Sequence, residues 1–208
     1  LEIYLAIRQS VKPDFGYYLN IGQHYILSFS PEEFFHTQGN IIKTYPMKGT
    51  RPRGVSLQQD QLLKEELKNS IKDKAEHLMI VDLLRNDIGK ICEYETVKVK
   101  DLFKVNSYPT IHQMVSCVYG TLKDKITHTD ILKALHPGGS VTGAPKESSM
   151  KIIDQLEDYN RGIYTGSIGF INDVGDMHFN MAIRTLSIYN KIAQYGVGGG
   201  IVWRSNDQ

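Results

Sequence analysis

Antiparallel hairpins and separate helices predict an α+β fold for this chain. Residues 164–171, 177–189 and 192–197 alternate apolar and polar side chains, which is the period-two pattern of antiparallel strands. Residues 57–87 instead repeat apolar side chains at helical spacing, and residues 146–156 form a second helical segment. Because strands and helices fall in separate runs, a doubly wound parallel sheet is not expected.

Turn and capping residues delimit the elements of the first part of the chain. Residues 1–10 predict a short helix. Three strands are expected before residue 50, at 17–21, 25–29 and 41–45. Ser30 followed by Pro31 predicts a helical turn, because serine caps helices well and proline suits their first position. Gly49–Gly54 is expected to be a polar loop.

The central part of the chain begins with the long helical segment. Ser56 is expected to cap it, and it should end near Asp87, just before the glycine stop signal at Gly89. Two strand-like runs follow, at 96–99 and 112–119. Thr129 is expected to cap a further helix that ends at Leu135.

The composition indicates an ordinary globular protein. The 208 residues are 41% hydrophobic and 23% charged with a formal net charge of +1, so an apolar core can form and no nucleic-acid partner is expected. Cys92 and Cys117 lack metal-ligand spacing, which favours a reduced, cytoplasmic setting. No apolar run approaches the roughly 20 residues of a membrane span, and the first residues lack a signal-peptide charge pattern.

Two glycine-rich segments suggest nucleotide binding, but their details oppose it. In Gly138–Gly143 the last glycine is followed by Ala144-Pro145 instead of the lysine of a phosphate loop, although the amides of a turn before a helix could still hold a carboxylate. Gly196–Ile201 follows a strand but opens no helix, so the dinucleotide fingerprint is not met. Close packing of strand backbones and contact with a flat ligand would explain it equally well.

Charged residues stand out on the long helical segment. Asp73 and Glu76 are three residues apart, so both carboxylates share one helix face. Such a pair is usually solvated, but with further acidic ligands it would suit Mg²⁺. Asp82, Arg85 and Asp87 instead predict an ion-pair network at the end of the same helix.

Lys48 is the most informative single residue. It is expected in a loop just after a strand. Most lysines are solvated surface charges, whereas a nucleophilic lysine must be neutral and needs burial or a nearby cation to lower its pKa. Arg51 and Arg53 are candidates for that cation. His112 lies in a strand-like run and would suit the core or a site.

Six segments taken together resemble the chorismate-utilising enzymes. They are Tyr45–Gly54, Ala75–Asp87, His136–Lys146, Arg161–Gly166, Asn180–Thr185 and Gly196–Trp203. Their order and spacing match that family along residues 1–208. The resemblance implies one chorismate-binding catalytic domain built from two mainly antiparallel sheets packed as a sandwich, with helices on the outside. It also implies a longer native protein, with an N-terminal portion and a C-terminal metal-binding helix beyond this chain.

Within this family, Lys48 bears on the choice of branch. Anthranilate synthases usually carry alanine at that position, whereas aminodeoxychorismate synthases typically carry lysine. The resemblance therefore implies an aminodeoxychorismate synthase component I, which converts chorismate and ammonia to 4-amino-4-deoxychorismate for folate synthesis. A partner glutamine amidotransferase subunit would supply the ammonia. Anthranilate synthase component I is the alternative, and a non-catalytic domain of the same descent is a further one.

The resemblance also implies roles for individual residues. Glu32 would protonate the departing C4 hydroxyl as a general acid, and Lys48 would attack C2 of the ring to form a covalent adduct. His112 matches a histidine that assists pyruvate release in anthranilate synthase. The residues that match substrate-binding positions are Gly49, Thr50, Thr142, Gly143, Tyr164, Arg184, Gly198, Gly199 and Gly200. Asp73 and Glu76 match two Mg²⁺-binding carboxylates, although most relatives carry glutamate at the first position.

Overall fold

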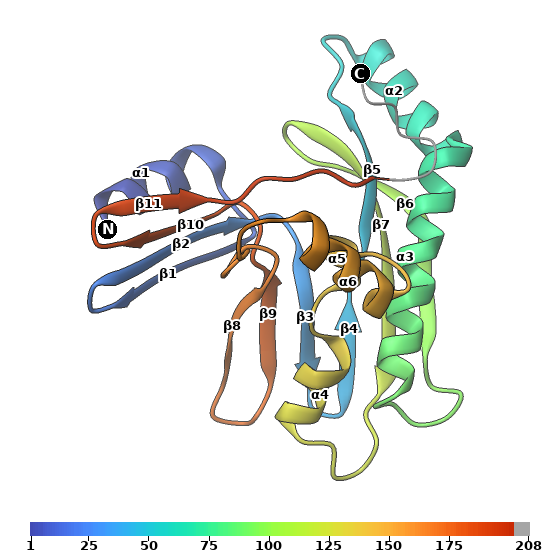
Figure 1. Ribbon diagram of the computed structural model, residues 1–208. Helices are drawn as coiled ribbons and strands as arrows, with labels where there is room; N and C mark the ends of the chain where they lie inside the picture. Colours follow the sequence, from blue (N-terminus) through green and yellow to red (C-terminus); the bar gives the residue numbers. More distant parts are fainter. Residues whose placement is uncertain (202–208) are drawn as a thin grey trace.

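The computed structural model describes residues 1–201, in which the strands form two antiparallel sheets (Figure 1). The smaller sheet has the order β1-β2-β10-β11, with strands β1 (Phe15–Ile21), β2 (His24–Ser30), β10 (Thr185–Tyr189) and β11 (Ile192–Tyr195). The larger sheet has the order β5-β7-β4-β3-β9-β8, and β6 pairs with β7. Its strands are β3 (Glu33–Gln38), β4 (Ile41–Thr44), β5 (Met47–Pro52), β6 (Lys98–Ser107), β7 (Ile111–Thr121), β8 (Ser167–Ile171) and β9 (Met177–Met181).

Helices accompany both sheets. They are α1 (Glu2–Val11), α2 (Leu57–Asn69), α3 (Ile71–Gly89), α4 (His128–Leu135), α5 (Gly139–Thr142) and α6 (Lys146–Leu156). Helix α1 contacts β2 of the smaller sheet, whereas α2 and α3 pack on β5 and β7 of the larger sheet. No helix within residues 1–201 is long and apolar enough to cross a bilayer. The predicted α+β class, with two antiparallel sheets and outer helices, is confirmed.

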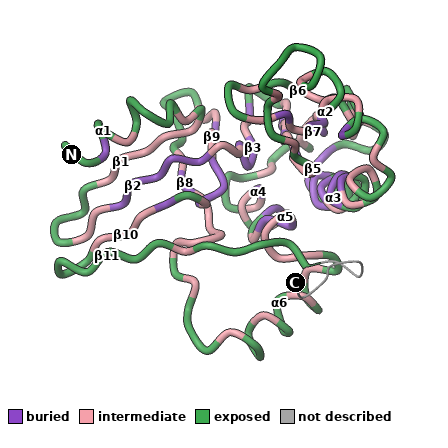
Figure 2. Tube along the Cα trace, turned by 90° about the horizontal axis from the view of Figure 1, so that it is seen from above, coloured by how far each residue is buried: buried purple, intermediate pink, exposed green. Residues whose placement is uncertain are grey.

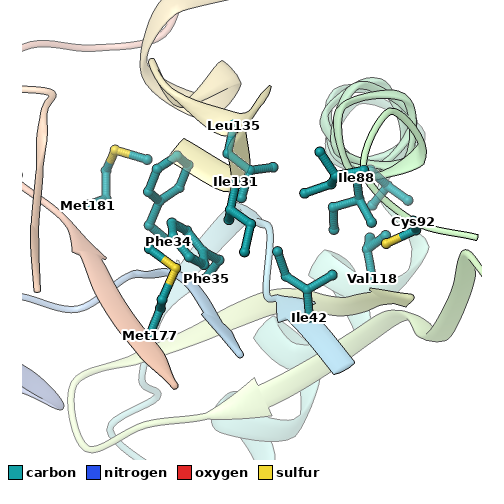
Figure 3. Close-up of a cluster of buried hydrophobic side chains, with 12 residues drawn as sticks. Phe34, Phe35, Ile42, Ile88, Cys92, Val118, Ile131, Leu135, Met177 and Met181 are labelled. Carbon is teal, nitrogen blue, oxygen red and sulfur yellow. The ribbon is translucent and has the colours of Figure 1, made fainter. Parts of the chain in front are cut away.

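The main core lies between the larger sheet and helices α3 and α4. Figure 3 shows side chains of the two layers gathered together, among them Phe35 and Ile42 from the sheet, Ile88 from α3 and Leu135 from α4. Each of these four side chains is at most 1% exposed. Because burying an apolar side chain of this size contributes roughly 1.5–3 kcal/mol, this cluster holds α3 and α4 on the sheet.

A smaller cluster joins the two sheets. Ile26 of β2, Ile168 of β8 and Ala182 are buried against one another. Asn180 of β9 adds a polar link, because its side-chain amide donates a hydrogen bond to Ser28 of β2 at 3.1 Å. The smaller sheet is therefore fixed against the β8–β9 end of the larger sheet. The buried positions of β2 are purple in Figure 2.

Several predicted elements are confirmed. The helix at 1–10 is α1, the strands at 17–21 and 25–29 are β1 and β2, and the helix at 146–156 is α6 with the predicted bounds. Ser56 caps α2 as predicted, because its hydroxyl accepts a hydrogen bond from the backbone N–H of Gln59 at 3.2 Å. Strong periodicity and clear caps therefore located these elements well.

The helical turn predicted after Ser30 is wrong. The Ser30 hydroxyl does accept a hydrogen bond from the backbone N–H of Glu32 at 3.2 Å, but the chain then continues into β3. Phe34 and Phe35 are both buried, and β3 pairs with β4 on one side and β9 on the other. Tertiary burial and strand pairing therefore outweigh the local capping preference.

The polar loop predicted at Gly49–Gly54 is also wrong, because β5 occupies most of it. Strand β5 pairs with β7, and the register shifts between Met47 and Thr50. Lys48 therefore lies at an irregularity within a strand and not in a free loop. Irregularities of this kind redirect side chains relative to the regular pleat.

The helical pattern predicted to be continuous is divided into α2 and α3. Ser70 is extended, with ψ 114°, and its hydroxyl accepts a hydrogen bond from the backbone N–H of Asp73 at 3.2 Å. A serine inside an apparently continuous pattern thus caps the second helix. The cap predicted at Thr129 is displaced as well, because Thr127 forms a capping box with Asp130 at the start of α4.

The single strand predicted at 177–189 is in fact β9 and β10, which belong to different sheets. Residues 182–184 carry the chain from one sheet to the other, and Arg184 there has a positive φ of 50°. Apolar alternation continues across this crossing, so periodicity alone does not reveal it. Strand β6 is likewise longer than the strand predicted at 96–99.

We predict that Ile42→Ala lowers the free energy of unfolding by about 2–5 kcal/mol, because it opens a cavity in the main core. Ile71→Ala is the matched control, since Ile71 is 82% exposed and its truncation should change stability by less than about 0.5 kcal/mol. Urea denaturation of both variants measures the difference. Equal losses for the two variants would contradict the described core.

Candidate active site

Three segments that are distant in the sequence meet at Ser140. The Ser140 hydroxyl donates a hydrogen bond to Glu32 Oε1 at 3.0 Å. Lys48 Nζ donates a hydrogen bond to the backbone oxygen of Ser140 at 3.2 Å. Glu32 immediately precedes β3, Lys48 belongs to β5, and Ser140 lies in the short helix α5. The structure therefore brings the expected acid and the expected nucleophile to two polar groups of Ser140, a residue that the sequence did not single out.

The position of Lys48 depends on the glycine that follows it. Gly49 has φ +78°, a conformation that other residues rarely adopt. A Cβ atom there would approach Leu67 Cδ1 to 2.9 Å and Asp73 Cβ to 3.0 Å. The backbone oxygen of Gly49 also accepts a hydrogen bond from Gln113 Nε2 at 3.1 Å. The close approach to α2 and α3 thus fixes the strand irregularity that carries Lys48.

The Glu32 carboxyl group holds its proton more tightly than an exposed carboxyl group does. Part of the residue reaches the surface, but its carboxyl group lies inside the protein, and this burial raises the pKa. The Ser140 hydrogen bond and the Lys48 charge oppose that shift without cancelling it. The backbone is fixed as well, because the Glu32 oxygen accepts a hydrogen bond from the N–H of Met181 at 3.0 Å.

His77 is a second residue near Lys48 that sequence reasoning did not select. It is fully buried on α3, and its Nε2 atom lies 2.7 Å from the Ser116 hydroxyl. Burial, together with the charge of Lys48, lowers the pKa of His77 to about 4. A neutral imidazole therefore adjoins the lysine at neutral pH. The sequence signal that could have selected His77 is its position directly after Glu76.

Asp73 and Glu76 lie on the first turns of α3, and Asp73 is next to Gly49. Arg51 Nη2 binds Asp73 Oδ2 at 3.0 Å and Arg51 Nε binds Glu66 at 2.7 Å. Within residues 1–201 no ion pair involves Glu76, and no group of three or more potential metal-binding side chains occurs. Glu76 is therefore the more available carboxylate, whereas Asp73 would have to exchange its arginine partner to bind a cation.

The expectation that Arg51 and Arg53 act as cations toward Lys48 is not supported. Arg51 is neutralised by the two carboxylates just described, and Arg53 Nε binds Asp60 Oδ1 at 2.7 Å. The Arg53 guanidinium holds the pKa of Asp60 well below its usual range. Arg51 thus links β5 to α2 and α3, and Arg53, directly after β5, pairs with α2.

His112 lies on the far side of this network. It is 1% exposed, its Nε2 atom is 3.0 Å from Asp60 Oδ1, and its Nδ1 atom is 3.0 Å from the Ser107 hydroxyl. Both ring nitrogens are therefore occupied by protein groups. None of these contacts reaches Glu32 or Lys48.

Tyr164 and the second glycine cluster form a separate region. A pocket of about 410 Å³ is lined by Tyr164, Thr185 and Gly196. A Cβ atom at Gly196 would collide with the Tyr164 ring, and one at Gly198 would come within 2.7 Å of its hydroxyl. These two glycines are therefore needed for packing against a protein side chain. Within residues 1–201, no atom lies within 4 Å of a Cβ built at Gly199 or Gly200, and Trp203 lies outside the described residues.

The remaining expected binding residues are dispersed around these two regions. Thr50 is exposed and donates a hydrogen bond to Gln113 at 2.9 Å. Thr142 lines a pocket of about 770 Å³ beside α6, and its hydroxyl donates to the Gly138 oxygen at 2.9 Å. Gly143 has φ +131°, which favours glycine. Arg184 is exposed at the crossing between the sheets.

We predict that Glu32→Gln stabilises the protein at neutral pH. Because the raised pKa means that the native state binds this proton more tightly than the unfolded state, stability falls as pH rises from the ordinary carboxyl pKa of about 4.3 through the native pKa. The variant should therefore gain stability over the wild type near pH 8 and match it at about pH 4. Thermal unfolding across this range, with exposed Glu95→Gln as control, measures the effect. A variant that loses stability near pH 8 would refute the assignment.

Comparisons with known proteins bear on the family of the chain. The family model described as chorismate binding enzyme matches residues 1–208. The chain is 46% identical over 208 residues to anthranilate synthase component 1 of Saccharolobus solfataricus, covering 100% of this chain and 49% of the relative. It is 42% identical over 207 residues to aminodeoxychorismate synthase component 1 of Escherichia coli, covering 100% and 46%.

A solved structure shows the same likeness. Anthranilate synthase component I from Streptococcus pneumoniae superposes with a TM-score of 0.84 at 35% identity, covering 92% of this chain and 42% of that chain. The chain spans about half the length of the curated relatives it matches. The match along all residues, with the fold described above, shows that the chain belongs to the chorismate binding enzyme family.

Proposed function

We propose that this chain forms the catalytic core of an aminodeoxychorismate synthase component I. The reaction replaces the C4 hydroxyl of chorismate with ammonia and keeps the enolpyruvyl group. The contact of Ser140 with both Glu32 and Lys48 carries this proposal. The contact supports the proposal because it brings a carboxyl group with a raised pKa and a lysine side chain to the same residue, and acid-assisted covalent catalysis needs an acid and a nucleophile close together.

The two residues would act in sequence. The Glu32 carboxyl donates its proton to the C4 hydroxyl, which leaves as water, while Lys48, after losing its ammonium proton, forms a bond from Nζ to C2 and passes one amine proton to the Glu32 carboxylate. Ammonia then forms a bond to C4 and gives up one proton to the protein, while the bond between C2 and Lys48 breaks and Glu32 returns a proton to the departing nitrogen, which restores the free amine. The net change converts chorismate and ammonia into 4-amino-4-deoxychorismate and water. Two easier displacements thereby replace one difficult displacement.

Anthranilate synthase is the alternative function. The relative that bears this name is 46% identical to the chain and the aminodeoxychorismate synthase is 42% identical, so overall identity does not separate the two activities. Lys48 favours the first proposal, because a lysine nucleophile has a role only where a covalent adduct forms. We further propose that a glutamine amidotransferase subunit delivers the ammonia, and that Tyr164 and Arg184 bind a substrate carboxylate.

We propose Mg²⁺ as the cofactor, with Glu76 and Asp73 among its ligands. Mg²⁺ commonly binds one or two protein carboxylates and completes its shell with waters and substrate oxygens, so two carboxylates on one helix face fit this ion. When bound, it would hold and orient the ring carboxylate of chorismate. Asp73 can contribute only if Arg51 moves from its present contact at 3.0 Å.

We predict that Lys48→Ala abolishes formation of 4-amino-4-deoxychorismate by the full-length protein. Chorismate, Mg²⁺ and an ammonium salt are supplied, and the products are separated by mass spectrometry. Lys104→Ala is the matched control, because the side chain of Lys104 is 57% exposed and its loss should leave turnover unchanged. Production of anthranilate and pyruvate at the same rate in wild type and Lys48→Ala would favour the alternative.

We predict that Glu76→Gln weakens Mg²⁺ activation by at least about tenfold, whereas Asp73→Asn weakens it less, because Asp73 is already bound by Arg51. Titration of the activity with Mg²⁺ gives the half-saturating concentrations, and calorimetry of Mg²⁺ binding provides a readout independent of turnover. Glu95→Gln serves as the exposed control. Wild-type Mg²⁺ binding by the Glu76 variant would exclude Glu76 as a ligand.

A further inference from the structure

Lys146 holds together the two ends of the loop that contains Ser140. Lys146 is the first residue of α6, and its Nζ atom donates a hydrogen bond to the backbone oxygen of Leu135, the last residue of α4, at 2.9 Å. These two residues flank the segment 136–145, which includes α5. One side chain therefore connects the two ends of the loop on which Ser140 lies.

The same ammonium group is anchored by a buried carboxylate. Lys146 Nζ lies 2.6 Å from Asp87 Oδ2. The two atoms are not aligned for a hydrogen bond, so the contact is chiefly ionic. The Asp87 side chain is 1% exposed and that of Lys146 is 15% exposed. Screening by solvent is weak at such a site, so separation of the pair would leave a charge buried without compensation.

Asp87 has a second cationic partner that provides a natural comparison. Lys90 Nζ donates a hydrogen bond to Asp87 Oδ1 at 2.8 Å, but the Lys90 side chain is 56% exposed. No described contact of this side chain reaches the 136–145 segment. The network predicted for Asp82, Arg85 and Asp87 is corrected accordingly, because Arg85 binds Asp82 at the surface while Asp87 binds the two lysines.

The segment is also packed tightly above this anchor. A Cβ atom at Gly139 would collide with the Leu83 side chain of α3, so α5 lies directly on that helix. The backbone oxygen of Val141 accepts a hydrogen bond from Arg161 at 3.1 Å. Ser140 between them is thus held from both sides, and a shift of the turn would alter its contacts with Glu32 and Lys48 together.

We propose that Lys146, anchored on Asp87, is a positioning residue that sets the place of Ser140 and through it the relative placement of Glu32 and Lys48. The inference rests on the proposed function for its catalytic meaning. The structural part of the proposal is that the contacts of Lys146 at the ends of segment 136–145 control the contacts of Ser140 within it. This part is testable without substrate.

The experiment follows the Glu32 carboxyl by ¹³C NMR in the full-length protein, as a pH titration of wild type, Lys146→Met, Ser140→Ala and the double variant. The Ser140 hydrogen bond lowers the Glu32 pKa, so its loss in Ser140→Ala should move the titration to higher pH. Lys146→Met should move it in the same direction. The double variant should shift by less than the sum of the two single shifts, because both changes remove the hydrogen bond from Ser140 to Glu32.

Lys90→Met is the matched control, because it removes the other cation of Asp87 without touching the loop, and it should titrate as wild type. Lys146→Arg should restore most of the wild-type titration. If Lys146→Met does not fold, the neutral pair Asp87→Asn/Lys146→Met replaces it, since no isolated buried charge then remains. A wild-type Glu32 titration in folded Lys146→Met, or shifts that add in the double variant, would overturn the proposal.

Turnover of chorismate separates this inference from the proposed function. If both hold, Lys146→Met should lower kcat by about 100-fold, the effect expected of a small misplacement of reacting groups, while KM changes much less. A shifted Glu32 titration in a protein whose wild type does not consume chorismate would leave the positioning role intact and refute the function. Unchanged kcat and titration in Lys146→Met, with an active wild type, would refute the positioning role alone.

Discussion

The packing of α3 on the larger sheet is the interaction on which the site depends. Its apolar side chains, such as Val81 and Ile88, are buried in the main core, and they fix the second half of the helix on the sheet. The same helix presents Asp73 and Glu76 on its first turns, His77 beside Lys48, and Asp87 near its end. Burial of one helix face therefore orders the candidate metal-binding carboxylates, the neighbour of the lysine and the anchor of the Ser140 loop.

The reactive groups themselves occupy irregular backbone. Lys48 lies at a register shift of β5 next to a glycine with positive φ, Glu32 lies just before β3, and Ser140 lies in a single helical turn. Regular elements hold each of these irregular points on both sides. A rigid frame with local departures from regular geometry allows three backbone segments to approach one substrate, which three regular strands could not do.

Much of the fold could be predicted from the sequence, and the failures have physical causes. Helix α6 and the β1–β2 hairpin follow from periodicity and turn residues that act locally. The helical turn after Ser30 failed because pairing of β3 with two neighbours outweighs the capping preference of a serine and a proline. The prediction of a loop at Gly49–Gly54 failed for the same reason, since a polar and glycine-containing segment becomes a strand by pairing with β7.

The residues of the candidate site were likewise predicted only in part. Lys48 was selected from one of the six matching segments and Glu32 from its place in Ser30-Pro31-Glu32, and both contact Ser140 in the structure. Ser140 and His77 were not selected, because their importance arises from contacts with residues far away in the sequence. The ion pair between Asp87 and Lys146 was also not predicted, since its partners are separated by β6, β7, α4 and α5 and no local pattern links them.

The most direct test of the central claim is mass spectrometry of the full-length protein mixed with chorismate and Mg²⁺ in the absence of ammonia. The account predicts a covalent adduct with the mass of chorismate less one water, located on the peptide that contains Lys48. It also predicts that added ammonium removes the adduct and releases 4-amino-4-deoxychorismate. Consumption of chorismate without any adduct at Lys48, or an adduct on a different lysine, would contradict the assignment of Lys48 as the nucleophile.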